Sequence, residues 1–287
     1  MKLGLICDGI SRDLSHAVSV MDEFDLKYAE LQFVGDREVG DHSTQEIKDI
    51  DNLLRDCGKP VSCLSRHIFN GMTGANVPGD ELHTKYMDAL KRVIDMAHVV
   101  DSPLVRIMTP KKEQILWGRN GAEKWNVAHG AWEKMLPLIA PACEVARDAG
   151  VTLVVETGNG TMVNSNYTAR KIIDDLDAKD VLKVLWDPGN NCWCHERAFP
   201  AGYEEVKDGY LGHVHIKDVQ VDTPRATLEV RRMGEGQLAD QFQPIADAMR
   251  ADSYMGVISF ESVYHPGNGN FEDGFRQSIG LFKSLFE

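Results

Sequence analysis

Short apolar stretches alternate along this chain with longer amphipathic stretches, and the pattern predicts the secondary structure. The short stretches have the length and β-branched content of buried strands, whereas the longer ones space their apolar residues three or four apart, as helices on a core do. A final helix over residues 271–286 closes the chain. Eight strands are predicted, at Lys2–Cys7, Tyr28–Val34, Val61–Leu64, Leu104–Met108, Val151–Val155, Val181–Leu185, His213–Ile216 and Gly256–Phe260.

Eight strand–helix units in 287 residues take about 36 residues each, which is typical of a (β/α)8 barrel. We therefore predict an α/β protein built as a single TIM barrel, with one domain over residues 1–287. An open, doubly wound sheet would carry a glycine-rich phosphate loop after its first strand, and the chain has none there. Because all strands of such a barrel end at one rim, we expect the chemistry at the carboxyl ends of the strands.

Composition excludes several partners. The formal net charge of −13 argues against nucleic acid and against an anionic membrane surface, since both are bound by clustered Lys and Arg. No apolar stretch has the length of a membrane span or of a signal peptide. The six cysteines show no framework spacing, which favours free thiols and a cytoplasmic protein.

The seventh predicted strand has an unusual polar face. Its sequence, His213-Val214-His215-Ile216-Lys217, alternates apolar residues with two imidazoles and an ammonium group. On an edge strand these side chains would face solvent. Apolar, helical sequence on both sides of the strand leaves no free solvent face, so we predict that they point inward and help to build a site.

Three further strands end in a carboxylate. Glu156 ends the fifth strand, Asp187 the sixth and Glu261 the eighth, so that with His215 four candidate ligands fall on four consecutive strands. They should converge on the rim, where three carboxylates and one imidazole suit Mn²⁺, Mg²⁺ or Co²⁺. For Asp187 alone, the alternative is a helix N-cap.

In these residues the chain resembles the xylose isomerase-like barrels, which include sugar isomerases, ketose 3-epimerases and inosose dehydratases. The resemblance covers most of the chain. It implies that Glu156, Asp187, His215 and Glu261 bind one divalent metal, with Mn²⁺ first among the candidates, and that Glu156 and Glu261 also act as acid and base. The motifs that carry it are Val154-Val155-Glu156, Asp187-Pro188-Gly189-Asn190, His213-Val214-His215-Ile216-Lys217-Asp218, Met233-Gly234-Glu235-Gly236-Gln237 and Ser259-Phe260-Glu261.

Such a site predicts a sugar isomerase or epimerase acting on a small keto-sugar through an enediolate. A metal chelated by the carbonyl and its neighbouring hydroxyl acidifies the proton between them, and two glutamates can remove and return it. The same groups could expel a β-hydroxyl, so a lyase of the inosose dehydratase or keto-glycoside eliminase type is the alternative. Ketose 3-epimerases carry His where this chain has Asn190 and Arg where it has Val221, which argues against that particular activity.

Five further residues are candidates for holding substrate, and all except Asn190 have an alternative role. His67 falls at the end of the third strand and Arg106 on the fourth, where the alternatives are a hydrogen-bonded loop histidine and an ion pair inside the barrel. Asn190 could bond a substrate hydroxyl, and Lys217 could polarise a substrate oxygen or pair with a carboxylate. His213 could bind substrate or orient a metal ligand from behind.

Other classes of protein fit the sequence less well. An abasic-site endonuclease would need a basic groove and further histidines, and Thr109 and Pro110 follow the fourth strand instead. A non-catalytic sugar-binding barrel, a phosphate site at 234–236, and a lid or subunit contact rather than helix packing over 117–132 are further alternatives. Family likeness suggests a homo-oligomer, a dimer or a tetramer, with a sugar or polyol as its small-molecule partner.

Overall fold

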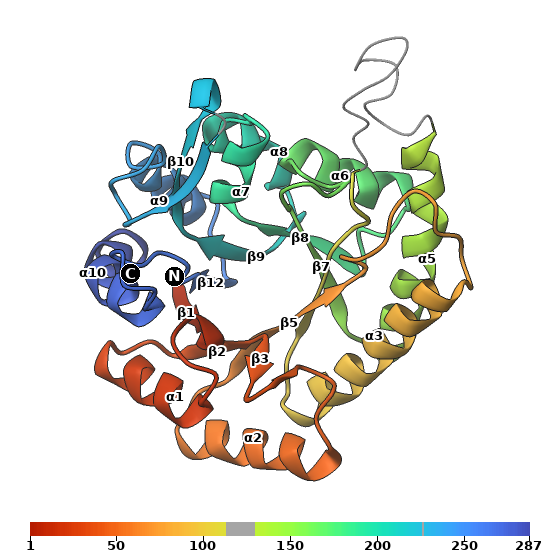
Figure 1. The fold of residues 1–287 in the computed structure, drawn as a ribbon, viewed down its shortest axis with the longest axis horizontal. Helices are drawn as coiled ribbons and strands as arrows, with labels where there is room; N and C mark the ends of the chain where they lie inside the picture. Colours follow the sequence, from red (N-terminus) through yellow and green to blue (C-terminus); the bar gives the residue numbers. More distant parts are fainter. Residues whose placement is uncertain (113–129, 226) are drawn as a thin grey trace.

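Eight parallel strands form a closed barrel surrounded by helices (Figure 1). The structure is a computed structural model that describes residues 1–112, 130–225 and 227–287. Around the barrel the strands follow the order β1-β12-β9-β8-β7-β6-β5-β2, so each strand neighbours the next barrel strand along the chain and the last closes on the first. The predicted single TIM barrel is confirmed. The barrel strands are β1 (Lys2–Ile6), β2 (Tyr28–Leu31), β5 (Val61–Ile68), β6 (Leu104–Ile107), β7 (Thr152–Glu156), β8 (Leu182–Trp186), β9 (Leu211–Ile216) and β12 (Val257–Phe260).

Helices follow the barrel strands and cover the outside of the barrel (Figure 1). Most of the described α-helices begin with a side chain that caps free backbone amides, although α5, α8 and α9 do not. Ser43 and Glu46, for instance, form a reciprocal capping box at α2. No helix in the described ranges is long and apolar enough to cross a membrane. The α-helices are α1 (Leu14–Glu23), α2 (Thr44–Asp56), α3 (Glu81–Val99), α5 (Ala131–Ala149), α6 (Asn166–Asp175), α7 (Pro188–Trp193), α8 (Tyr203–Val206), α9 (Phe242–Ala251) and α10 (Phe271–Phe286).

Buried apolar side chains form two separate clusters. The large cluster joins the strands to the helices around them and contains fully buried aromatic residues such as Trp186 and Phe282. The small cluster consists of Cys63, Val154 and Leu185, one from each of three barrel strands. The small size of this second cluster leaves much of the barrel interior to polar side chains, which is unusual for a barrel of this type.

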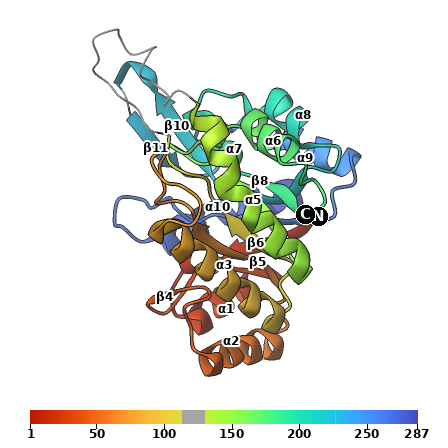
Figure 2. The ribbon, with the colours of Figure 1, turned by 90° about the vertical axis from the view of Figure 1, so that its right-hand side faces the viewer.

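Within the described residues, two antiparallel hairpins interrupt the strand–helix repeat. The predicted strand Tyr28–Val34 breaks after Leu31, and its end forms β3 (Phe33–Val34), which pairs with β4 (Arg37–Glu38). After β9, the chain forms β10 (Asp218–Asp222) and β11 (Thr227–Arg231), a hairpin that stands out from the body of the barrel (Figure 2). Neither hairpin was predicted, because both follow barrel strands directly and carry mixed polar sequences.

Strand β5 and helix α5 also refine the prediction. Strand β5 extends to Ile68, so that His67 lies within the strand and not after it. Trp132 lies on α5, where its ring packs on the large core cluster and its indole donates to Asp175, as helix packing predicts. The rest of the 117–132 stretch, up to residue 129, lies outside the described residues.

Asp218 fastens the loop after β11 to the barrel. The buried carboxylate accepts hydrogen bonds from the backbone amides of Gly234 and Gly236, each at 2.9 Å, and from Leu238 at 3.2 Å. A Cβ atom on Gly236 would lie 2.3 Å from the Asp218 carboxylate, so only glycine fits there. The amides that could have bound a phosphate at 234–236 are therefore already bonded to a side chain.

Replacing Asp218 by Asn is expected to destabilise the protein by about 2 kcal/mol. The amide retains one acceptor oxygen but turns its NH₂ group toward backbone donors, which leaves buried N–H groups unsatisfied. Urea denaturation of the variant and the wild type measures the difference in the free energy of unfolding. An unchanged midpoint would show that the loop is held by other contacts.

Candidate metal centre

Four side chains meet at the carboxyl end of the barrel. Each has a ligand atom within 4.8 Å of the others: Glu156 ends β7, Asp187 follows β8, His215 lies on β9 and Glu261 follows β12. All except Glu261 are buried, and the side chain of Glu261 is 20% exposed. The strands are neighbours in the order β7, β8, β9 and β12, so the two glutamates lie at the ends of an arc with Asp187 and His215 between them.

Asp187 has two roles, one for each oxygen. Its Oδ1 accepts from the backbone amides of Gly189 at 2.8 Å and Asn190 at 3.2 Å, and so caps α7. Its Oδ2 accepts from the ammonium group of Lys217 inside the barrel. The N-cap alternative is thus correct for one oxygen, while the other oxygen faces the cluster.

Two buried cations pair with these carboxylates. Arg106 on β6 donates to Oε2 of Glu156 at 2.8 Å and to the Ser65 carbonyl at 2.8 Å, which is the ion pair inside the barrel that the sequence offered as an alternative. Lys217 donates to Oε2 of Glu261 at 2.7 Å and to Asp187. The inward direction predicted for Lys217 is confirmed, because its side chain is only 9% exposed.

The pKa values follow from these contacts. Burial opposes ionisation of Glu156, but Arg106 and His215 outweigh it and lower its pKa to about 2. Asp187 differs: burial, together with repulsion from Glu261 and Glu156, outweighs Lys217 and raises its pKa to about 7. The cluster therefore holds more carboxylate charge than its own cations stabilise.

The donor set fits a divalent cation. The carboxylates in and next to the cluster are Glu30, Glu156, Asp187 and Glu261, whereas the permanently charged cations are Arg106 and Lys217. These carboxylates outnumber the permanent cations by two, and Glu30 and Glu156 raise the pKa of His215 well above its usual value despite its burial. A divalent cation bound here would balance the excess of negative charge in place of a proton on His215. Three carboxylates and one imidazole are also the ligand types that such cations bind.

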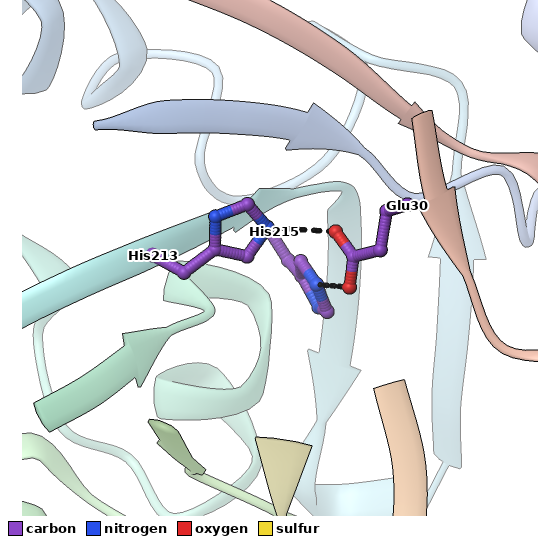
Figure 3. A group of neighbouring side chains, drawn as sticks. All are labelled: Glu30, His213 and His215. Carbon is purple, nitrogen blue, oxygen red and sulfur yellow. Dashed lines mark hydrogen bonds and ion pairs between the residues drawn. The ribbon is translucent and has the colours of Figure 1, made fainter. Parts of the chain in front are cut away.

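Sequence reasoning missed Glu30, the residue behind the histidines. Glu30 lies on β2, is fully buried, and accepts from Nε2 of His213 at 2.7 Å and from Nε2 of His215 at 2.8 Å (Figure 3). Both histidines are 0% exposed, so the edge-strand interpretation of β9 is wrong. His213 is not one of the four cluster residues; its ring packs edge-on against that of His215, with the ring centroids 5.5 Å apart. A signal was present in the sequence: Glu30 is a carboxylate in the middle of an otherwise apolar strand.

The remaining candidates lie near the rim but are bonded to protein groups. His67 is 36% exposed, and its Nδ1 lies 2.8 Å from Oε1 of Glu38, within a cavity of about 470 Å³ that none of the four cluster residues lines. The amide of Asn190 donates to the Thr157 carbonyl at 2.6 Å and accepts from the Trp193 indole at 2.8 Å. The structure thus brings Arg106, Lys217 and the four candidate ligands together and places Asn190 beside Asp187, whereas His67 lies in the separate cavity.

The fold and the cluster together define a TIM barrel with a candidate metal centre at the carboxyl ends of its strands. The family model described as xylose isomerase-like TIM barrel matches residues 18–285. The chain belongs to this family, as its motifs indicated. A search of curated protein sequences finds no match.

Solved structures share the fold at low sequence identity. The 3-keto-D-glucoside 4-epimerase of E. coli is 18% identical with a TM-score of 0.70, each chain covering 99% of the other. The IOLI protein, solved with a bound zinc atom, is 15% identical with a TM-score of 0.71, over 100% of this chain and 98% of that one. A D-psicose 3-epimerase solved with D-fructose is 14% identical with a TM-score of 0.71, over 100% and 99% of the two chains.

Proposed function

We propose that this protein is a divalent-metal-dependent sugar isomerase or epimerase that acts on a small keto-sugar. The observation that carries the proposal is the cluster itself, in which Glu156 and Glu261 lie at the two ends of an arc of ligands. A substrate seated over this arc would have a carboxylate at either end, which is the arrangement that proton removal and return require.

Each residue has a part in this proposal. Glu156, Asp187, His215 and Glu261 would hold the metal, which when bound polarises the substrate carbonyl and acidifies the neighbouring C–H bond. Glu156 and Glu261 are both held in the ionised form, because Arg106 and Lys217 lower their pKa values against the effect of burial. One glutamate takes the proton from the carbon beside the carbonyl, and the other returns a proton from the opposite side or at the neighbouring carbon.

The structural neighbours support the substrate class and the need for a metal. Their names describe a 3-keto-glucoside epimerase and a ketose epimerase, one neighbour was solved with zinc, and a barrel from Mycobacterium smegmatis was solved with magnesium. We propose Mn²⁺ for this chain, with Mg²⁺ or Co²⁺ as alternatives. The cytoplasmic location and the homo-oligomeric assembly stay predictions from the sequence.

A lyase is the second candidate, and the structure gives a reason to retain it. The amide of Asn190, which stands where ketose 3-epimerases carry a histidine, is bonded at both ends to protein groups. Val221, which stands where they carry an arginine, lies on β10 and offers no charge. With neither group present, the same two glutamates could remove a proton and assist loss of a β-hydroxyl.

The test is a screen of keto-sugars, inososes and 3-keto-glycosides with the Mn²⁺-loaded protein in deuterated water. We expect deuterium to appear on the carbon beside the carbonyl of at least one substrate. Epimer or isomer formation would identify the first candidate, whereas water loss or aglycone release would identify the lyase. A protein that binds Mn²⁺ but exchanges no such proton on any substrate would contradict the proposal.

A further inference from the structure

Glu30 joins two strands that are not neighbours in the barrel. Its strand, β2, is separated from β9 by β1 and β12 in the barrel order, so the carboxylate reaches across the interior to the histidines (Figure 3). Oε1 accepts from His215 and from the hydroxyl of Ser65, and Oε2 accepts from His213. Every donor in this group is fully buried, so no water competes for the bonds.

These bonds determine which nitrogen His215 presents to the cluster. A carboxylate can only accept hydrogen bonds, so Nε2 of His215 carries a proton where it meets Glu30 at 2.8 Å. The other nitrogen, Nδ1, then faces the cluster, 3.2 Å from Oε1 of Glu156. A rotation of the ring by half a turn about its Cβ–Cγ bond would break the bond to Glu30.

We infer that Glu30 is a positioning residue, which holds His215 with Nδ1 toward the ligand cluster and so increases the affinity of the cluster for a divalent cation. The inference rests on the metal site of the proposed function. A carboxylate that accepts the second N–H of a ligating histidine fixes the orientation of the ring and makes the imidazole a stronger ligand. His213 is a second donor to the same carboxylate and keeps it aligned from the opposite oxygen.

The geometry distinguishes this role from a second metal site. Glu30, His213 and His215 are residue types that bind metals and lie close together. However, each histidine meets its own oxygen of Glu30 at 2.7 or 2.8 Å, the spacing of charge-assisted hydrogen bonds, and Ser65 also donates to Oε1. Both oxygens of Glu30 therefore already accept hydrogen bonds from protein donors, which leaves them poorly suited to binding a cation.

The test compares Mn²⁺ binding to the wild type and to Glu30→Gln by isothermal titration calorimetry, on metal-free protein at one pH. Glutamine keeps the shape of the side chain but not its charge, and we expect Mn²⁺ to bind about 10–100-fold more weakly. Ser259→Ala is the matched control. It removes the hydroxyl 3.2 Å from Nε2 of His213, in the same buried network, and should leave Mn²⁺ affinity unchanged.

Thermal denaturation of the metal-free proteins separates positioning from support of the fold. A Glu30→Gln variant that melts earlier but binds Mn²⁺ as tightly as the wild type would overturn the inference. So would a second equivalent of Mn²⁺ in the wild type that the variant loses, because Glu30 would then be a ligand itself. A third outcome separates the two proposals. If the wild type binds Mn²⁺ more tightly than Glu30→Gln but turns over no sugar, the inference stands and the proposed function is wrong.

A measurement on the wild type covers the case in which the variant does not fold. In ¹⁵N-histidine-labelled protein loaded with Zn²⁺, the His215 ring is identified by its absence from the spectrum of His215→Gln. We expect a proton on Nε2 and the metal shift on Nδ1. The reverse assignment, with the metal on Nε2, would overturn the inference.

Discussion

Replacing Glu261 or Glu156 by Gln is expected to lower turnover by about 10²–10⁴-fold when the enzyme is saturated with Mn²⁺. Each substitution removes a group that we propose to exchange a proton with the substrate, while the glutamine oxygen can still face the metal. Turnover is therefore measured at a series of Mn²⁺ concentrations, so that weaker metal binding is separated from slower chemistry.

Exchange in deuterated water identifies which glutamate serves which face of the substrate. In a two-base mechanism, a variant that lacks one base should still exchange the proton of the epimer that the other base deprotonates. Glu156→Gln and Glu261→Gln are therefore expected to retain exchange with opposite epimers. If either variant binds metal and substrate and turns over at the wild-type rate, the assignment of the two bases is wrong.

A surface glutamate provides the control for these variants. Glu23 on α1 has a side chain that is 51% exposed and pairs with Arg276 on the outside of the barrel. Glu23→Gln makes the same chemical change far from the rim, and turnover should not change.

The convergence of the four candidate ligands could be predicted from the sequence because three of them end apolar strands. In a parallel barrel the end of a strand determines where its next residue lies, so Glu156, Asp187 and Glu261 had to reach the same rim. His215 followed from the two-residue period of its strand. The barrel strands were located for the same reason, since their apolar stretches are short and clearly bounded.

Contacts between distant strands could not be predicted in the same way. Glu30 meets residues more than 180 positions along the chain, as its separations of 183 and 185 from the histidines show. A period of two shows that Glu30 points inward but not what it meets there. The pairing of Lys217 with both Asp187 and Glu261, and the turn of β3–β4 that brings Glu38 to His67, likewise depend on side-chain reach and on a local hairpin.

Arg106 provides the largest expected effect on stability. Its side chain is 4% exposed, and its guanidinium bonds Glu156, whose side chain is 6% exposed, and a backbone carbonyl of β5. Replacing Arg106 by Met leaves a buried carboxylate without its main cation, which is expected to cost about 3–5 kcal/mol at neutral pH. For a chain of 287 residues, with an unfolding entropy of about 2.1 cal/mol/K per residue, that corresponds to a fall in Tm of about 5–8 °C.

The pH dependence of this loss has a definite sign. In the wild type the pKa of Glu156 is lowered from 4.5 to about 2, so its ionised form stabilises the fold above pH 4.5, and this contribution is lost as the pH falls toward 2. Without Arg106, burial raises the pKa of Glu156. Near that pKa, Glu156 binds a proton in the folded variant but is ionised in the unfolded chain. The difference in stability between variant and wild type should therefore be large at pH 7 and shrink below pH 4.5.

Thermal denaturation of the metal-free proteins across this pH range measures the effect, and two variants make it specific. Arg147→Met removes an exposed pair with Asp180, whose side chains are 45% and 57% exposed, and should change the free energy of unfolding by about 1 kcal/mol or less. The double variant Arg106→Met with Glu156→Gln should be more stable at pH 7 than Arg106→Met alone, because it no longer buries an unpaired charge. Equal Tm values for Arg106→Met and the wild type at pH 7 would show that Arg106 and Glu156 do not form an ion pair. The count of charges that favours a divalent cation in the cluster would then have to be revised.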